Sequence, residues 1–213
     1  MNKIHIEIWS DIMCPFCYIG KRNFESALSK YPYKDQIKVE WKSYQLSPQL
    51  VTDPNVTLDD MLANHKQISK EQAKSLNQQV SEFAASVGLN YQLDKAIQAN
   101  TFNAHRLIHF AKANNLQDEM EEALFKAYFT DGKNIDDLPT LTEIGIEIGL
   151  NSEELEQTLS TDTYSDAVRA DFYEAQQIGV TGVPFFVFNS KKAISGAQPP
   201  EVFIQLLEEM SNN

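Results

Sequence analysis

Cys14 and Cys17 are the two cysteines of the chain, and two residues separate them. Apolar alternation over residues 3–10 predicts a buried strand before them, and helical periodicity predicts a helix over about 17–30. Cys14 is therefore expected where a strand gives way to a helix. A helix N-terminus favours negative charge, and so favours a nucleophilic thiolate near neutral pH. Cys17, one turn later, could attack a mixed disulfide formed on Cys14.

The same thiols could instead form half of a zinc site, or be buried and inert. Zinc needs four ligands, and the chain has no further cysteine but has four histidines. His105 and His109 have the spacing of one helical turn and could complete a Cys₂His₂ set. Their separation from Cys17 is far outside zinc-finger spacing. We therefore expect no metal and favour a two-electron thiol–disulfide site.

Composition limits the classes of protein to consider. The chain has 213 residues, 42% of them hydrophobic, and a formal net charge of −12. That length suffices for one large domain or a domain with a substantial insertion. The negative charge argues against nucleic acid and anionic membrane surfaces as partners. No apolar run approaches the roughly 18 residues of a membrane span. His5 and Glu7 interrupt the first apolar segment, so no signal peptide is predicted and a cytoplasmic location is expected.

Strand signals lie at both ends of the chain, with helical signals between them. Alternation over residues 37–44 predicts a second strand, giving a strand–helix–strand unit that should be parallel and right-handed. Residues 184–189 and 193–195 predict a hairpin, and a last helix begins at Pro199 or Pro200. Sheet elements at both ends imply an insertion. The expected division is residues 1–50 with 180–213, and an all-helical insertion, 51–179, that covers the site.

A second motif precedes the late strand. Residues 179–188 place Pro184 at the mouth of an apolar segment. A proline there can simply mark the start of a strand. It can also follow a cis peptide bond, which is uncommon and would be a built feature.

The two motifs and the order of elements resemble the thioredoxin-like superfamily. More narrowly, the chain resembles its DsbA-like branch and, within that, the cytoplasmic FrnE-type oxidoreductases. The resemblance covers nearly the whole chain and is carried by four stretches: Ser10-Asp11 through Cys14-Pro15-Phe16-Cys17-Tyr18-Ile19-Gly20-Lys21; Asn100-Thr101 with Ala104-His105-Arg106-Leu107; Thr181-Gly182-Val183-Pro184; and Ser195-Gly196-Ala197-Gln198.

This resemblance implies an α/β thioredoxin-like fold, β-α-β then β-β-α, with a large helical insertion. It implies that Cys14 is the nucleophile and Cys17 the resolving thiol. It also implies a cis Val183-Pro184 peptide facing the cysteines, with the backbone of Val183 pairing with an extended substrate segment as sheet edges do.

The expected function is that of a thiol–disulfide oxidoreductase acting on protein or small-molecule thiols and disulfides. The same branch resembles kappa-class glutathione transferases and 2-hydroxychromene-2-carboxylate isomerases, which use a serine at the first position. A glutathione-dependent isomerase or transferase is therefore one alternative, and a non-catalytic redox-regulated binding protein or chaperone is another. No cofactor is required, glutathione is a possible redox partner, and the protein is expected to be a monomer or homodimer.

Four further residues are candidates near the site. Pro15 fits the first helical turn, where no intrahelical hydrogen bond is lost. Phe16 offers the Cys14 thiolate no charge or hydrogen bond, unlike the histidine of exported DsbA, which predicts a less oxidising potential; simple packing is the alternative. Asp11 could be an acid–base group, but a helix cap is favoured. His105 should face the site, either as a structural residue or as a group favouring the thiolate.

Overall fold

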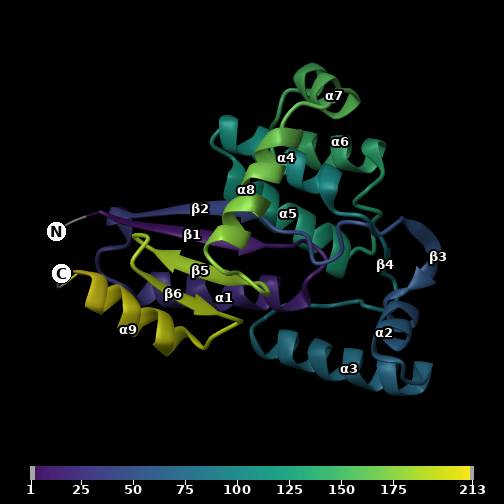
Figure 1. Cartoon of the computed structure of the whole chain (residues 1–213), viewed down its shortest axis with the longest axis horizontal. Helices are drawn as coiled ribbons and strands as arrows, with labels where there is room; N and C mark the ends of the chain where they lie inside the picture. The colour runs from purple at the N-terminus through teal and green to yellow at the C-terminus, as the bar shows by residue number, and fades with distance from the viewer. Residues whose placement is uncertain (1–2, 212–213) are drawn as a thin grey trace. The chain divides into compact units, whose positions relative to one another are not determined.

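The computed structural model describes residues 3–211, and the chain divides into two compact units (Figure 1). The sheet unit comprises Met1–Leu46 and Arg169–Asn213, and the helical unit comprises Ser47–Val168. The dividing points lie at different residues from those that the sequence predicted. The assignment of 51–179 as a separate insertion domain stays a prediction.

The sheet unit begins with the expected strand–helix–strand and ends with a hairpin and a helix. Its four-stranded sheet has the order β2-β1-β5-β6, with β1 parallel to β2 and antiparallel to β5. The pairing of β1 with β2 runs without a shift from Ile4 opposite Ile37 to Ser10 opposite Ser43. The elements are β1 (Ile4–Ser10), α1 (Pro15–Lys30), a 3-10 turn (Lys34–Gln36), β2 (Ile37–Ser43), β5 (Phe185–Phe188), β6 (Lys192–Ser195) and α9 (Pro200–Ser211).

One face of this sheet carries most of its hydrophobic core. Ile4, Ile6 and Ile8 alternate along β1 and pack with side chains of α1 and α9. There the rings of Phe24, Phe186 and Phe203 form a triangle with centroids 4.8–5.7 Å apart. Each such buried aromatic side chain contributes roughly 1.5–3 kcal/mol. This core fixes α1, and with it the cysteines, against β1 and β5.

The opposite face is anchored to α8 (Ser165–Gln177), whose last part belongs to the sheet unit. The Asp171 carboxylate accepts a hydrogen bond from the backbone N–H of Ser43 at 2.9 Å. The backbone carbonyl of Asp171 accepts one from the Trp9 indole at 3.0 Å. Trp9 also packs with Ala175 and Val187. These long-range contacts explain why the sheet unit resumes inside α8.

Two helices of the helical unit begin with capping boxes. Capping boxes join Thr57 to Asp60 and Ser69 to Gln72. The chain also contains a short antiparallel ladder, β3 with β4, which the sequence did not predict. The elements are β3 (Asp53–Thr57), α2 (Leu58–Lys66), α3 (Lys70–Ser86), β4 (Ile97–Gln98), α4 (Phe102–Ala113), α5 (Gln117–Phe129), α6 (Leu138–Glu147), α7 (Ser152–Ser160) and the start of α8. No helix within residues 3–211 has the length and hydropathy to cross a membrane.

Candidate active site

Cys14 occupies the N-cap position of α1, directly after the loop that leaves β1. Its backbone is extended, and Pro15 begins the helix. The Cys17 N–H donates to the Cys14 carbonyl at 3.0 Å, and the Cys14 N–H donates to the Asp11 carbonyl at 3.0 Å. The first turn of α1 contains no acidic residue that would oppose a thiolate. The geometry therefore places the first thiol at the positive end of a helix.

The two thiols differ in their access to solvent. Cys14 is 5% exposed and Cys17 is 1% exposed, and the structure has them as free thiols. Phe16, between them, is 42% exposed. A partner molecule therefore meets Phe16 and the Cys14 side of the pair first.

Burial raises the pKa of the Cys17 thiol well above its ordinary value, and the hydrogen bond and charge of Cys14 act in the same direction. The Asp11 backbone and the Ser10 side chain oppose this shift through hydrogen bonds, without cancelling it. A buried thiol of this kind stays protonated near neutral pH. Cys17 is thus suited to the second step of an exchange rather than to the first attack.

Val183 and Pro184 lie against the thiols. The peptide bond between them is cis, as the resemblance implied. The Cys14 thiol donates to the Val183 carbonyl, with 3.5 Å between Sγ and O. Val183 is half-buried, so part of its surface stays open. The segment between Gly179 and Pro184 therefore places the backbone of Val183 beside Cys14.

A close contact between α1 and Pro184 fixes this arrangement. Gly20 lies in the second turn of α1, and a Cβ atom there would be 2.9 Å from Cγ of Pro184. From the other side, the Gly196 N–H donates to the Pro184 carbonyl at 2.8 Å. Pro184 is thereby held between the active-site helix and the loop after β6. Sequence reasoning did not assign Gly20 this role, although a glycine inside a helix costs about 1 kcal/mol and is itself a signal.

The Ser195-Gly196-Ala197-Gln198 motif is tied to the same helix. Asn23 of α1 donates from Nδ2 to the Gln198 carbonyl at 3.0 Å. Gln198 donates in turn from Nε2 to the Ser195 carbonyl at 2.8 Å. Asn23 is 6% exposed, so its amide is dedicated to this bond network. The motif thus acts as a support for Pro184.

Asp11 is fully buried, and its Oδ2 accepts a hydrogen bond from the Leu46 N–H at 2.7 Å. The N-cap position belongs to Cys14, three residues later. This hydrogen bond joins the loop after β1 to the segment after β2. An acid–base role for Asp11 stays a prediction.

His105 belongs to the helical unit and is 1% exposed on α4. Its proposed action on Cys14 stays a prediction. Its neighbour Arg106 has a clear structural part: the guanidinium donates to the carbonyls of Thr158, Thr161 and Thr163, at the end of α7 and just beyond it. Burial lowers the pKa of Arg106, and the charge of Asp162 opposes that shift. The Ala-His-Arg motif thus includes a residue that closes a helix end.

Across residues 3–211, no group of three or more His, Cys, Asp or Glu side chains is arranged to hold a metal ion. The site itself offers two adjacent thiols of unequal burial, beside a backbone carbonyl and an exposed aromatic ring.

Comparison with known proteins agrees with this geometry. Residues 5–208 match the model of the DSBA-like thioredoxin domain. The chain is 30% identical over 208 residues to the uncharacterized protein YwbO of Bacillus subtilis (strain 168), covering 97% of this chain and 96% of that one. A crystal structure of a probable DsbA oxidoreductase from Streptomyces coelicolor is 37% identical, with a TM-score of 0.92 over 99% of this chain and 91% of that one.

More distant structures share the fold. The cytosolic disulfide reductase DsbM of Pseudomonas aeruginosa, solved with GSH, is 18% identical with a TM-score of 0.69, covering 98% of this chain and all of that one. The thioredoxin-like α/β fold that the resemblance implied is confirmed. On the match of almost its whole length, the chain belongs to the family of DsbA-like thioredoxin domains.

Proposed function

We propose that the protein is a thiol–disulfide oxidoreductase in which Cys14 is the nucleophile and Cys17 the resolving thiol. The observation that carries the proposal is the inequality of the two thiols. Cys14 stands at the N-cap position of α1 beside the Val183 carbonyl, whereas Cys17 is buried and its thiol has a raised pKa. Membership of the DsbA-like family supports the same chemistry.

The exchange has two balanced steps. The Cys14 thiolate attacks one sulfur of a substrate disulfide, forms a mixed disulfide and releases the other sulfur as a thiolate. Cys17 then loses its proton and attacks Sγ of Cys14, which forms the Cys14–Cys17 disulfide and releases the second substrate thiolate. Two electrons pass to the substrate. The reverse sequence oxidises a substrate dithiol, and neither direction needs a metal or an organic cofactor.

Other parts of the site have supporting roles in this proposal. An extended substrate segment pairs with the backbone at Val183, and the exposed ring of Phe16 gives it an apolar contact. Protein and small-molecule thiols or disulfides are the proposed substrates, in a cytoplasmic setting. Glutathione is proposed as a redox partner, which the structure of DsbM with GSH makes a natural first choice.

Equilibration with a glutathione redox buffer, followed by alkylation and mass measurement, tests the proposal. We expect a reversible two-electron transition between the dithiol and the Cys14–Cys17 disulfide, and its midpoint decides between reductant and oxidant. Thiols that stay reduced over the whole range, or a bound zinc mass, would refute the proposal.

Variants of the two thiols separate the proposed function from its alternatives. Cys17→Ser should accumulate a mixed disulfide on Cys14, and Cys14→Ser should form none. Isomerase or transferase activity that survives Cys17→Ser would instead favour a glutathione-dependent enzyme of the other class. Normal binding of a partner by Cys14→Ser, with negligible insulin reduction by the unaltered protein, would favour a non-catalytic chaperone.

A further inference from the structure

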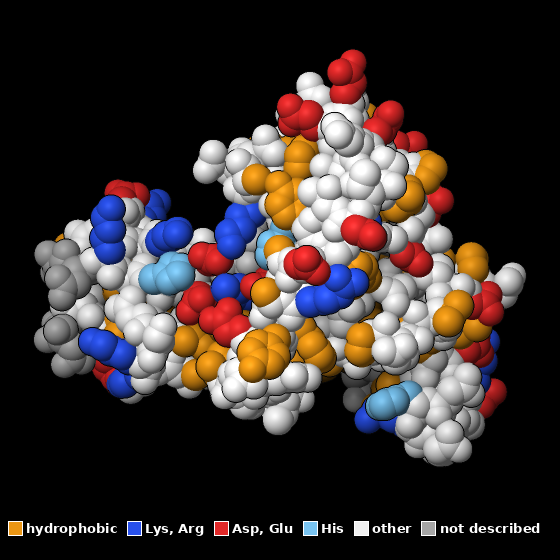
Figure 2. Space-filling model, turned by 45° about the horizontal axis from the view of Figure 1, so that its top comes forward, with side chains coloured by type: hydrophobic (Ala, Val, Ile, Leu, Met, Phe, Trp, Pro, Cys, Tyr) orange, Lys and Arg blue, Asp and Glu red, His pale blue; other side chains and the backbone are white. Residues whose placement is uncertain are grey.

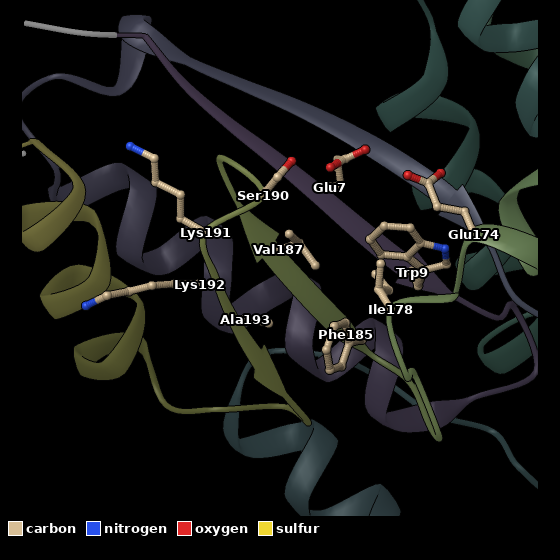
Figure 3. Close-up of a pocket in the computed structure, with 10 residues that line it drawn as sticks. All are labelled: Glu7, Trp9, Glu174, Ile178, Phe185, Val187, Ser190, Lys191, Lys192 and Ala193. Atoms are coloured by element: carbon tan, nitrogen blue, oxygen red, sulfur yellow. The ribbon is translucent and has the colours of Figure 1, made fainter. Parts of the chain in front are cut away.

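A hollow of about 220 Å³ lies in the sheet unit, on the face opposite α1 and α9 (Figure 3). Its apolar walls come from β1, β5 and the residue just after α8. The ring of Trp9 is buried there with Val187, while Phe185 is half-buried and Ile178 is 47% exposed. The lining residues are Glu7, Trp9, Glu174, Ile178, Phe185, Val187, Ser190, Lys191, Lys192 and Ala193. The hollow is therefore an apolar surface with charged groups at its rim.

Carboxylates gather on one side of this hollow. Glu7 and Glu174 line it and share the ammonium of Lys42, at 3.7 and 3.1 Å. Lys42 also meets Glu40 at 3.5 Å and Asp171 at 3.4 Å. One lysine thus faces four carboxylates. Burial opposes the charge of Lys42, but the carboxylates outweigh that effect and raise its pKa, so the lysine stays protonated.

The other charged groups nearby do not offset this negative excess. His5 pairs with Glu40 at 3.3 Å, and Lys38 contacts the same carboxylate, which lies opposite Glu7 in the β1–β2 pairing, at 3.9 Å. Lys192 pairs with Glu209. In Figure 3 the amine ends of Lys191 and Lys192 point away from the Trp9 ring, whereas the carboxylates of Glu7 and Glu174 lie on the same side of it. Figure 2 shows acidic, basic and hydrophobic side chains lying close together on one face of the molecule.

The size and openness of the hollow indicate what kind of group it takes. Pockets for drug-sized ligands occupy roughly 300–1,000 Å³, so about 220 Å³ suits one large side chain rather than a cofactor. β6 is the edge strand of the sheet, and Lys192, Ala193 and Ser195 on it are exposed. A chain segment can therefore cross this edge and place one side chain in the hollow.

We infer that the hollow is a docking site for a partner protein, which inserts one aromatic side chain against Trp9, Phe185 and Val187 and sets a neighbouring lysine or arginine against Glu7 and Glu174. Aromatic residues combine large buried area with little conformational entropy cost, and they are enriched at the centres of interfaces. A cation beside two half-buried carboxylates supplies charge complementarity and fixes the direction of the segment. The inference goes beyond the thiol chemistry and does not depend on it.

Three peptide probes test this docking site: N-acetylated, C-amidated Lys-Trp-Lys, Gln-Trp-Gln and Glu-Trp-Glu. Each is titrated into the ¹⁵N-labelled full-length protein, and amide shifts are followed. We expect shifts at Val187 and Ala193 and at the Trp9 indole N–H, with the lysine peptide bound about fivefold more tightly than the glutamate peptide at low salt. High salt should reduce that difference.

Two variants and a matched control localise the effect. Glu174→Gln should remove most of the preference for lysine, whereas Glu208→Gln makes the same charge change on an exposed part of α9 and should leave it intact. Ala193→Phe should fill the hollow and weaken all three peptides; its thermal unfolding midpoint checks that it folds.

Several results would overturn the inference. These are shifts confined to other residues, equal binding of the three peptides, or equal effects of Glu174→Gln and Glu208→Gln. Shifts at Val187 that depend on protein concentration without peptide would assign the hollow to a second copy of the chain instead. Cysteine chemistry takes no part in the titration, so its outcome is separate from that of the redox test.

Discussion

Replacement of Gly20 by alanine should disturb the candidate active site without touching either cysteine. The added Cβ would lie 2.9 Å from Cγ of Pro184 and 3.6 Å from both the Ala197 Cα and the Phe186 ring. Ordinary contact begins near 3.4 Å, so Pro184 must retreat by about 0.5 Å. Alanine gains about 1 kcal/mol of helix propensity, but overpacking costs about 1–3 kcal/mol. The free energy of unfolding should fall by up to about 2 kcal/mol.

The displacement should also slow thiol exchange. A misplacement of 1 Å can cost about 10²-fold in rate, so 0.5 Å at Pro184 should cost roughly tenfold. That corresponds to about 1.4 kcal/mol of activation free energy. The assay is the second-order rate at which the reduced protein reacts with oxidised glutathione, quenched by acid and read by mass after alkylation. Urea unfolding measures stability in parallel.

Gly182→Ala is the matched control, because a Cβ there meets no atom within 4 Å and the backbone is outside the left-handed region. It should change the exchange rate much less than Gly20→Ala. A Gly20→Ala protein that is about 1 kcal/mol more stable and exchanges at the unaltered rate would refute the reasoning. It would mean that the Pro184 ring accommodates the methyl group without moving the site.

Three further predictions concern stability. Arg106→Ala should lower the free energy of unfolding by about 2–4 kcal/mol, because the carbonyls at the end of α7 lose a charged donor; urea denaturation measures the loss, and hydrogen exchange should rise at 158–163. The raised pKa of Cys17 should make the reduced protein lose stability above about pH 8.5, by up to ~1.4 kcal/mol per pH unit, because the unfolded state releases its proton first. Thr57→Ala should cost about 1 kcal/mol in thermal or urea unfolding by removing the capping box with Asp60.

Each of these three stability predictions has its own control. Arg106→Lys keeps the charge but not the fork of donors, so it should lose less than alanine does; equal losses would show that the fork of donors, not the charge, matters. Cys17→Ala should flatten the alkaline part of the stability profile, and an unchanged slope would assign it to other groups. Ser69→Ala removes the second capping box and should cost a similar amount to Thr57→Ala; no loss in either would contradict the capping argument.

Local pattern predicted the parts of the fold that are set by local physics. The alternation in β1 and β2 and the position of Cys14 at a helix start follow from residue spacing alone. The presence of Pro184 before β5 did not decide whether the Val183-Pro184 peptide bond is cis or trans. Only the family resemblance implied the cis form that the structure has. The end of α1 was predictable too, because Tyr31 precedes a proline and stays extended.

The unpredicted features depend on contacts between distant parts of the chain. Gly20 makes room for Pro184, and Asn23 donates a hydrogen bond to the Gln198 carbonyl. Both contacts join residues more than 160 positions apart, so no short stretch of sequence reveals them. β4 is only two residues long, too short for alternation to mark it. The sheet unit resumes within α8 because of the bonds that Asp171 makes, whereas the sequence shows only a continuous helical period.

The strand order has a consequence for biosynthesis. β1 and β2 emerge from the ribosome first, but β5, which pairs with β1, follows the whole of Ser47–Val168. At roughly 5–20 residues per second, that interval lasts on the order of ten seconds. During it the isoleucines of β1 have no α9 to cover them, and the cysteines have no Val183 or Pro184 beside them. In the nascent protein the two thiols are therefore open to oxidation for several seconds before the residues that contact Cys14 in the folded protein have been synthesised.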